Sequence, residues 1–458
     1  MIRIFSHFVP ARFALLLLLE AIVVSVAAFA GMSIADLSGA YPGRAQLEPA
    51  LAALPFGVLL IINSMGLYQV EGTEDRNMTR PRLLVAGLLA CLLCAVMSRL
   101  APSESTRPDA LAAILLFAIC GSALTRFLVF KYGNAPKRKR RVLVLGTGCP
   151  KFAEAARKNL NHTIVGYVAI QPGNSDGTAP VFEIKPNESL LSLVQKHRID
   201  EIVIAKGDRR GGALPVQDLL QCRLSGVNVI ELASYFEREY RQVLLESLNP
   251  SWLVFGDGFN AGVARAIVKR CFDVLASLGL LLVTSPVLLI AAACIVVESP
   301  GSLLYRQQRV GASGRLFTVY KLRSMRNDAE NDGKPRWAVA NDQRITRVGA
   351  FLRKLRIDEL PQIFNVLKGD MSFIGPRPER PFFVDQLSEQ IPYYAMRHTM
   401  KPGITGWAQV RFPYGASLED AVEKLQYDLY YVKNNGLFLD LMIFFATIEV
   451  VLWGRGAR

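Results

Sequence analysis

Cysteine and charge are both scarce in this sequence. Seven of its 458 residues are cysteines, and Cys91, Cys94 and Cys120 lie inside apolar runs, which argues against a disulfide framework or a zinc module. Charged residues make up 20% of the chain and hydrophobic residues 51%. That composition excludes an intrinsically disordered or collagen-like chain. At about 150 residues per domain, the length indicates about three units.

Acidic residues are in deficit. There are 39 Asp and Glu against 53 Lys and Arg, a formal net charge of +14. The excess lies in two blocks, residues 131–141 with +6 and residues 306–356 with +9. Such a balance indicates an anionic partner, which could be nucleic acid, an anionic membrane or a phosphorylated substrate.

Four apolar runs occupy the first third of the chain, at 13–32, 51–68, 83–98 and 110–130. Each is near the ~20 residues that cross a hydrocarbon core, and the third is the shortest. Basic residues precede the first run, separate the second from the third and follow the fourth. The positive-inside rule therefore puts both ends of this bundle in the cytoplasm. The basic run 137–141 directly follows an apolar run, which favours a membrane anchor over a nucleic-acid site.

The middle of the chain alternates strand-like with helix-like segments, which predicts a parallel α/β sheet. Strands are expected at 141–145, 164–170, 201–205 and 227–232, and helices at 151–159, 189–197 and 215–225. Gly146-Thr-Gly148 ends the first strand, but Lys151 stands where a dinucleotide fingerprint has its third glycine. We therefore expect a Rossmann-like scaffold that binds no nucleotide.

A further apolar stretch, 274–297, is long enough to span a membrane but is interrupted by Ser285-Pro286. Proline removes a helical hydrogen bond, and serine can bond the freed carbonyls. Basic residues flank both ends of the stretch. This symmetry predicts a re-entrant helix that enters and leaves on the cytoplasmic side. A kinked fifth span is the alternative.

The segment 346–356 combines an apolar and a basic face. Val348, Phe351, Leu352 and Leu355 recur at helical spacing, opposite four basic residues. A helix of this pattern is expected to lie in the interface of an anionic membrane. A solvated surface helix is the alternative.

Asp358 and Glu359 directly follow this basic segment. Nearby cations would lower the pKa of the aspartate and keep it ionised. An ionised carboxylate can attack a phosphoryl group to form an acyl phosphate. Its neighbour could hold Mg²⁺, which prefers oxygen ligands and substrate phosphates. Taken without its context, such a pair is more often a solvated surface pair.

Further basic residues accompany the two acids. Arg377 and Arg380 lie in a proline-rich turn, and their planar guanidinium groups suit phosphate oxygens. Lys321 and Arg323 occupy alternate positions, so both can face one side of a strand. Trp407 is expected either to pack a base or to belong to the core.

These motifs resemble the catalytic domain of the bacterial polyprenol-phosphate phosphoglycosyl transferases, the monotopic bacterial sugar transferase family. The resemblance covers residues 265–453, and the tail 412–431 is similar to the exopolysaccharide subtype associated with exosortase systems. The matching stretches are Lys269-Arg-Cys-Phe-Asp273, Ser285-Pro286, Arg309-Val-Gly311, Lys321-Leu-Arg323-Ser-Met325, Leu355-Arg-Ile-Asp358-Glu359-Leu-Pro-Gln362, 369–377 and 401–410.

The resemblance implies a reaction and a set of roles. A UDP-hexose gives its phospho-sugar to undecaprenyl phosphate, and UMP leaves, through a covalent intermediate on Asp358. Glu359 would assist through Mg²⁺ or proton transfer, so Asp358 and Glu359 are the expected metal ligands. Ser285 and Pro286 make the helix break. The expected phosphate contacts are Lys321, Arg323, Arg356, Arg377 and Arg380.

The predicted fold class is a membrane protein of α plus α/β type. We expect a four-helix transmembrane bundle (1–133), a Rossmann-like parallel α/β domain (134–248), a linker (249–264) and a mainly helical monotopic catalytic domain (265–458) whose re-entrant helix covers about 268–297. The protein is expected to be a multi-pass homodimer of the bacterial inner membrane. Both non-bundle domains then lie on the cytoplasmic side, and the partners are inner-membrane lipid and the two substrates, with no nucleic acid.

Two other functions compete with this prediction. A membrane-bound nucleotide-sugar epimerase or dehydratase needs an intact dinucleotide loop and usually a Tyr-x-x-x-Lys pair. None of Tyr167, Tyr235 and Tyr240 has a lysine four positions later. A non-catalytic membrane scaffold needs no reactive carboxylate, so substitution of Asp358 discriminates among all three functions.

Overall fold

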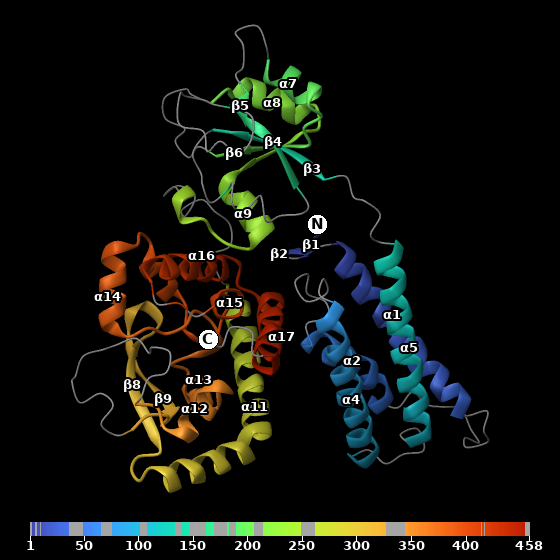
Figure 1. Ribbon diagram of the computed structural model, residues 1–458, viewed down its shortest axis with the longest axis vertical. Coiled ribbons are helices and arrows are strands. Elements are labelled where there is room, and N and C mark those ends of the chain that lie inside the picture. The colour runs from blue at the N-terminus through green and yellow to red at the C-terminus, as the bar shows by residue number, and fades with distance from the viewer. Residues whose placement is uncertain are drawn as a thin grey trace. The chain divides into compact units, whose positions relative to one another are not determined.

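The computed structural model in Figure 1 describes residues 2–4, 7–9, 11–35, 49–65, 76–100, 108–132, 139–146, 152, 162–168, 181–182, 189–205, 214–248, 262–326, 344–413, 415 and 417–453. The chain divides into two units. One comprises Met1–Asn134, Ala261–Ala421 and Asn434–Arg458, and the other comprises Ala135–Asn260 with Val422–Lys433.

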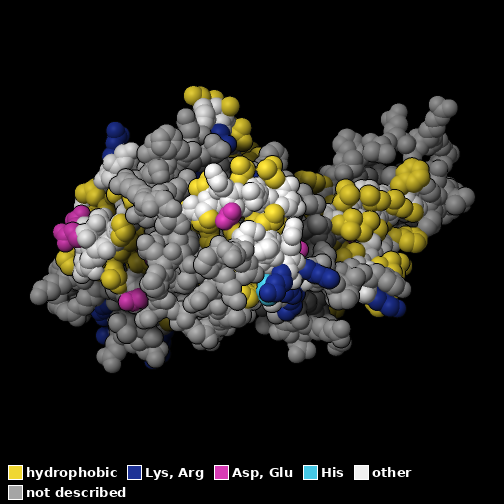
Figure 2. Space-filling model, turned by 90° about the horizontal axis from the view of Figure 1, so that it is seen from above, with side chains coloured by type: hydrophobic (Ala, Val, Ile, Leu, Met, Phe, Trp, Pro, Cys, Tyr) yellow, Lys and Arg dark blue, Asp and Glu magenta, His cyan; other side chains and the backbone are white. Residues whose placement is uncertain are grey.

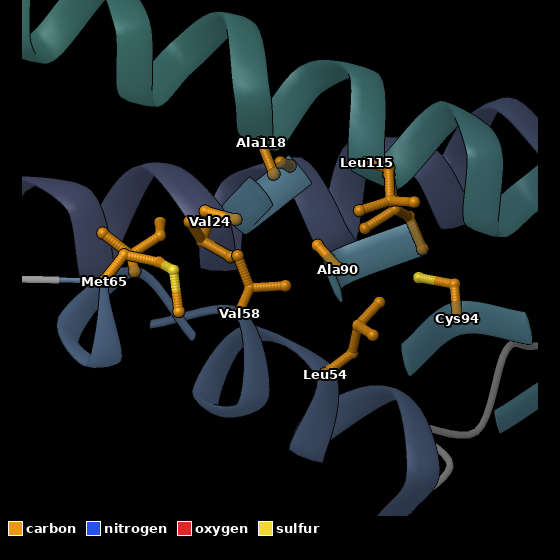
Figure 3. Packing of buried hydrophobic residues seen from close by; sticks show 12 residues of the cluster. Val24, Leu54, Val58, Met65, Ala90, Cys94, Leu115 and Ala118 are labelled. Atoms are coloured by element: carbon orange, nitrogen blue, oxygen red, sulfur yellow. The ribbon is translucent and has the colours of Figure 1, made fainter. Parts of the chain in front are cut away.

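Helices form over all four N-terminal apolar runs, after a short antiparallel hairpin of β1 (Ile2–Ile4) and β2 (His7–Val9). The helices pack on one another around a shared apolar core, which includes Val24, Leu54, Ala90 and Leu115 (Figure 3). Their bounds are α1 (Ala11–Ala35), α2 (Pro49–Ser64), α4 (Arg76–Leu100) and α5 (Pro108–Tyr132).

Hydrophobic side chains also cover the outside of these helices, as Figure 2 shows at the right of the view. Among the described residues, however, α11 (Val263–Glu298) is the one helix long and apolar enough to cross a membrane. Shorter apolar stretches lie at Ala14–Ala27, Leu84–Val96 and Ile114–Val129. The structure therefore confirms four helices at the predicted spans, while that they cross a membrane stays a prediction.

Charged residues inside this helical core are paired. Arg126 Nε lies 2.6 Å from Glu20 Oε1, and both side chains are buried. Arg82, also fully buried, lies 2.9 Å from Glu449 of α17 (Leu437–Trp453). An unpaired charge in such an apolar setting would be costly, so each pair fixes which helix faces meet.

The second unit contains the predicted parallel α/β sheet, with strand order β5-β4-β3-β6-β7. Alternate residues of β3 serve the two faces of the sheet: Leu143 and Leu145 pack against α7 and α8, whereas Val142 and Val144 pack against α9. The bounds are β3 (Arg140–Leu145), β4 (His162–Val168), β5 (Val181–Phe182), β6 (Glu201–Ile204), β7 (Asn228–Glu231), α7 (Leu190–Lys196), α8 (Val216–Leu224) and α9 (Leu232–Tyr240).

Several predictions fall on residues outside the described ones. These residues are the glycine loop beyond Gly146, all of the predicted helix 151–159 except position 152, and positions 249–261 of the predicted linker. Gly146 itself has a φ of 114°, a left-handed conformation that favours glycine and supports the predicted turn.

Helix α16 (Leu418–Asn434) joins the α/β unit although it lies far along the chain. Its part Val422–Lys433 clusters with that unit. Lys433 Nζ donates to Glu237 at 2.8 Å, Gln242 Nε2 donates to Glu423 Oε1 at 2.8 Å, and the Val243 amide donates to the Gln426 carbonyl at 3.0 Å. The sequence did not predict that part of α16 belongs to the α/β unit.

The remaining described segment builds a compact region around α11. Its elements are the antiparallel hairpin of β8 (Leu304–Val310) and β9 (Leu316–Leu322), the parallel pair of β10 (Ser372–Ile374) and β11 (Gly403–Thr405), helices α12 (Arg347–Lys354), α13 (Gln362–Lys368), α14 (Pro381–Gln390), α15 (Trp407–Arg411) and α17, and 3-10 helices η5 (Ile357–Glu359) and η6 (Tyr394–Thr399).

Helix α11 is bent into two arms, as Figure 1 shows. Pro286 lies inside the helix, where it cannot donate a backbone hydrogen bond. Thr284 Oγ1 donates to the Leu280 carbonyl at 2.7 Å, and Ser285 Oγ donates to the Leu282 carbonyl at 3.1 Å. Leu282 and Val283 beside the break are 78% and 74% exposed. The bend thus presents apolar side chains outward at its apex.

The apolar side chains of helix α12 are divided between a buried core and the surface, which the sequence did not predict. Leu352 is buried in a core with Ala291 and Ile295 of α11, and Val348 packs against it, whereas Phe351 is 60% exposed. Glu298 at the end of α11 accepts from the backbone amides of Arg347 and Val348, at 2.9 and 3.0 Å. A carboxylate at a helix N-terminus is favoured, so these bonds fix α12 to α11.

Candidate active site

Asp358 and Glu359 lie on η5, the short turn between α12 and α13. The chain reaches this turn through Arg356, which adopts a left-handed conformation with φ 59°, and leaves it through Pro361, the residue that precedes α13. Both acids are only 8% exposed. Their burial rules out the solvated surface pair that the two residues alone would indicate.

Three cations surround Glu359. Its Oε1 accepts from Lys321 Nζ at 2.8 Å and from Arg377 Nη2 at 2.9 Å, and Arg356 Nη1 lies 3.6 Å from Oε2. Burial by itself would raise the pKa of Glu359, but Arg377, Lys321 and Arg356 hold the pKa of that carboxyl well below its usual range. Glu359 is therefore an ionised anchor for the three cations.

Asp358 stands in a different environment on the same turn. Its buried Oδ1 has no hydrogen-bond partner among the described residues. Burial and the adjacent charge of Glu359 raise the pKa of Asp358 to about 6, against opposing effects of Lys321, Arg353 and Arg356. The nearby cations do lower this pKa, as expected, but burial and Glu359 outweigh them. The expectation of a lowered pKa at Asp358 is therefore wrong in its net direction.

Helix α13 and strand β9 are joined so that Lys321 reaches Glu359. Asn365, fully buried on α13, accepts from the Tyr320 amide at 3.1 Å and donates to the Thr318 carbonyl at 2.7 Å. A buried amide side chain that satisfies two main-chain groups of one strand fixes that strand in register. Lys321, the next residue, is thereby aimed at the carboxylate.

The structure gathers three of the five predicted phosphate contacts, Lys321, Arg356 and Arg377, around Glu359. Arg323 donates to the main-chain carbonyls of Ser299 and Pro300, just beyond the end of α11. Arg380 stands immediately before the first residue of α14. Their expected phosphate contacts stay predictions.

A buried charged network behind the site was not predicted. Asp273 of α11 accepts from Ser372 Oγ at 3.0 Å and from the Phe373 amide at 3.1 Å. Lys269 lies 3.2 Å from Asp273 and 3.1 Å from Asp440 of α17. These residues tie α11, β10 and α17 together. The sequence contains the signal in Lys269-Arg-Cys-Phe-Asp273, where the two charges stand one helical turn apart.

Close backbone contact between β10 and β11 explains the glycines of this region. A Cβ on Gly403 would collide with the backbone nitrogen of Gly375, and one on Gly375 would collide with the carbonyl oxygen of Lys401. Trp407, just after β11, is buried, with the Arg411 guanidinium 4.7 Å from its ring centroid. Of the two expectations for this residue, its burial fits the core.

The donor set at η5 fits Mg²⁺ bound together with substrate phosphates. The described residues contain no cluster of three or more His, Cys, Asp or Glu side chains that would cage a metal alone. Mg²⁺ is usually held by one or two carboxylates, water and phosphate oxygens, and Asp358 has an oxygen without a hydrogen bond. Asp358 is thus a suitable ligand for a metal that arrives with its substrate, whereas both oxygens of Glu359 are already contacted by cations.

The same unit thus contains a bent apolar helix and two adjacent buried carboxylates, one of which is contacted by three cations. Residues 264–454 match the family model described as bacterial sugar transferase. The exopolysaccharide production protein PSS of Rhizobium leguminosarum bv. phaseoli is 42% identical over 187 residues, which are 40% of this chain and 94% of that protein. The chain belongs to the bacterial sugar transferase family.

Two longer relatives carry more specific names. The UDP-N-acetylgalactosamine-undecaprenyl-phosphate N-acetylgalactosaminephosphotransferase of Aeromonas hydrophila is 44% identical over 240 residues, 52% of this chain and 56% of the relative. The undecaprenyl-phosphate glucose phosphotransferase of Komagataeibacter xylinus is 34% identical over 329 residues, 69% of this chain and 60% of the relative. The chain thus spans less than two thirds of the length of each.

Proposed function

We propose that this protein transfers a hexose-1-phosphate from a UDP-sugar to undecaprenyl phosphate and releases UMP. The observation that carries the proposal is that two adjacent buried carboxylates have different surroundings. Three cations surround Glu359, while Asp358 Oδ1 has no hydrogen-bond partner among the described residues. The names of the two longer relatives support the same substrate classes. The reaction would be the first membrane step of exopolysaccharide synthesis.

In the first half-reaction, Asp358 attacks the β-phosphorus of the UDP-sugar. A bond forms between a carboxylate oxygen and phosphorus, the bond from that phosphorus to the bridging oxygen breaks, and UMP leaves with the electron pair. In the second half-reaction, a phosphate oxygen of undecaprenyl phosphate attacks the same phosphorus. The carboxylate of Asp358 then leaves, and the enzyme is restored.

Glu359 holds Lys321 and Arg377 where the phosphoryl group would react. Preorganised cations stabilise the charge that develops in phosphoryl transfer, and this is usually the largest catalytic contribution. The Arg377 side chain is partly exposed, so its guanidinium can also reach a substrate phosphate. Asp358 would hold Mg²⁺, which when bound neutralises phosphate charge.

A lipid-linked acceptor requires the site to lie at a membrane surface. The bent α11 with its exposed apolar apex, and Phe351 projecting from the basic α12, support a re-entrant helix and an interfacial helix. We place the four N-terminal helices across the bacterial inner membrane with both ends cytoplasmic, on the flanking charges. Homodimer formation stays a prediction.

The test is UMP release and transfer of radiolabelled sugar phosphate to undecaprenyl phosphate, with a panel of UDP-sugars. The native protein should release UMP only from the UDP-sugars that it accepts as donors. Asp358→Asn should abolish release and keep the melting temperature, whereas Asp385→Asn, at an exposed position of α14, should keep activity. Undiminished turnover in Asp358→Asn contradicts the nucleophile. Conversion of the sugar without UMP release would favour the epimerase or dehydratase.

A further inference from the structure

The loop between β10 and α14 is held by its main-chain carbonyls. Four consecutive carbonyl oxygens each accept a hydrogen bond from a residue outside the loop, and the donors come from β8, β11 and η6. The bonds are Gly403 N to Pro376 O at 2.9 Å, Arg397 Nη2 to Arg377 O at 3.0 Å, Arg309 Nη1 to Pro378 O at 3.0 Å and Val310 N to Glu379 O at 3.0 Å.

Arg397 is a charged donor in a buried position. It is only 6% exposed, and its Nη1 donates to the Tyr394 hydroxyl at 2.6 Å. The guanidinium carbon also lies 5.1 Å from the centroid of the Tyr394 ring. A buried guanidinium is costly to desolvate, so a planar group fixed by a ring, a hydroxyl and a carbonyl is a rigid support.

The supported carbonyl belongs to a residue of the proposed active site. Arg377 donates to Glu359 Oε1 at 2.9 Å. Pro376 and Pro378 flank it, and the φ angle of each proline is fixed, so the chain around Arg377 has little other freedom. The hydrogen bond from Arg397 to the Arg377 carbonyl therefore fixes the backbone position from which the Arg377 side chain extends.

We propose that Arg397 is a positioning residue that aims Arg377 at Glu359. The kinetic side of this inference rests on the proposed phospho-sugar transfer, but the structural side does not. Arg397 acts through the loop backbone and needs no contact with substrate. Tyr394 supports it through the hydroxyl bond and the ring contact.

Arg377 is one of three cations at Glu359, together with Lys321 at 2.8 Å and Arg356 at 3.6 Å. If the backbone at Arg377 shifts, its guanidinium moves away from Glu359 and from the place where the phosphoryl group is proposed to react. The site then loses a preorganised cation, so the rate of UMP release falls.

The experiment compares Arg397→Gln, Arg397→Lys and Tyr394→Phe in the full-length protein. A matched control is Arg270→Gln, because Arg270 donates to two main-chain carbonyls at the end of α13, those of Val366 and Leu367, and not to this loop. Hydrogen–deuterium exchange of the peptide 375–380 reports loop opening without any need for activity. The kcat of UMP release is measured in parallel.

We expect Arg397→Gln to speed exchange in 375–380 and to lower kcat about 10- to 100-fold, the range that loss of a charged hydrogen bond represents. Arg397→Lys should recover part of each effect, and Tyr394→Phe should show a smaller effect. Arg270→Gln should change stability without opening the loop.

Loop exchange and a kcat in Arg397→Gln that match the wild type would overturn the proposal. Equal loop opening in Arg270→Gln would also overturn it, because the effect would then be general destabilisation. If the wild type releases no UMP from any UDP-sugar, the proposed function fails. The exchange comparison still decides whether Arg397 positions the loop.

Discussion

Lys321 donates to Glu359 at 2.8 Å, and Asp358, one residue earlier, has an oxygen without a hydrogen bond in the described part of the chain. One lysine thus separates the roles of two neighbouring acids. Glu359 is the electrostatic anchor, and the buried Asp358 keeps the lone pairs that an attack on phosphorus needs.

The first prediction concerns pH. Because burial and Glu359 raise the pKa of Asp358 to about 6, its ionised fraction falls as the pH drops through that value. UMP release in the absence of lipid acceptor should therefore be half-maximal near pH 6 and rise toward neutral pH. Rapid-quench measurement of the first turnover checks this. A flat rate between pH 5 and 7 would contradict an ionised Asp358 as the attacking group.

The second prediction concerns Lys321. Lys321→Met removes one cation from Glu359 and an interaction that lowers the pKa of Asp358. UMP release should fall at least about tenfold, as for loss of a charged hydrogen bond, and the acidic limb should move to higher pH. Lys368→Met is the matched control, since Lys368 is exposed and forms a surface pair with Asp370 at 3.0 Å. Similar losses in both variants would argue against a specific role for Lys321.

The third prediction concerns Arg82 and Glu449. Glu449→Gln leaves the fully buried Arg82 guanidinium without the carboxylate at 2.9 Å. Breaking a buried pair from one side costs about 3–5 kcal/mol, whereas replacing both partners by apolar residues is often neutral. The single variant should melt well below the wild type in detergent, and the Arg82→Met/Glu449→Leu double variant should recover. Equal melting temperatures for all three proteins would show that the pair contributes nothing.

The fourth prediction concerns the sidedness of α11. Cysteines placed at the exposed positions Lys139 and Arg315, in a protein without its native cysteines, should both be labelled from the cytoplasmic side. Pro286→Ala restores a backbone donor within the helix and favours a straight span. It should therefore increase labelling of position 315 from the periplasm. Periplasmic labelling of that position in the unaltered helix would establish a fifth span in place of a re-entrant one.

Much of this protein follows from local pattern. Apolar runs of about 20 residues predict the N-terminal helices, and strand-like runs that alternate with helix-like ones predict the parallel sheet. The helix break is predicted by Ser285-Pro286, because a proline lacks a donor wherever it stands. The sequence also predicts five residues of the site, namely Asp358, Glu359, Lys321, Arg356 and Arg377.

Only the tertiary structure decided which charges meet. Lys321 and Arg377 lie 38 and 18 residues from Glu359 along the chain, and no local pattern states that both bind it while Arg323 turns to the end of α11. The pKa of Asp358 depends on burial, and burial is a property of the folded surroundings. Two further sets of contacts also join residues that are distant in the sequence. They are the hydrogen bond from Arg397 to the Arg377 carbonyl and the hydrogen bonds between α16 and the α/β unit. The sequence determined which groups are present, and the fold determined which of them stay charged, paired or free to react.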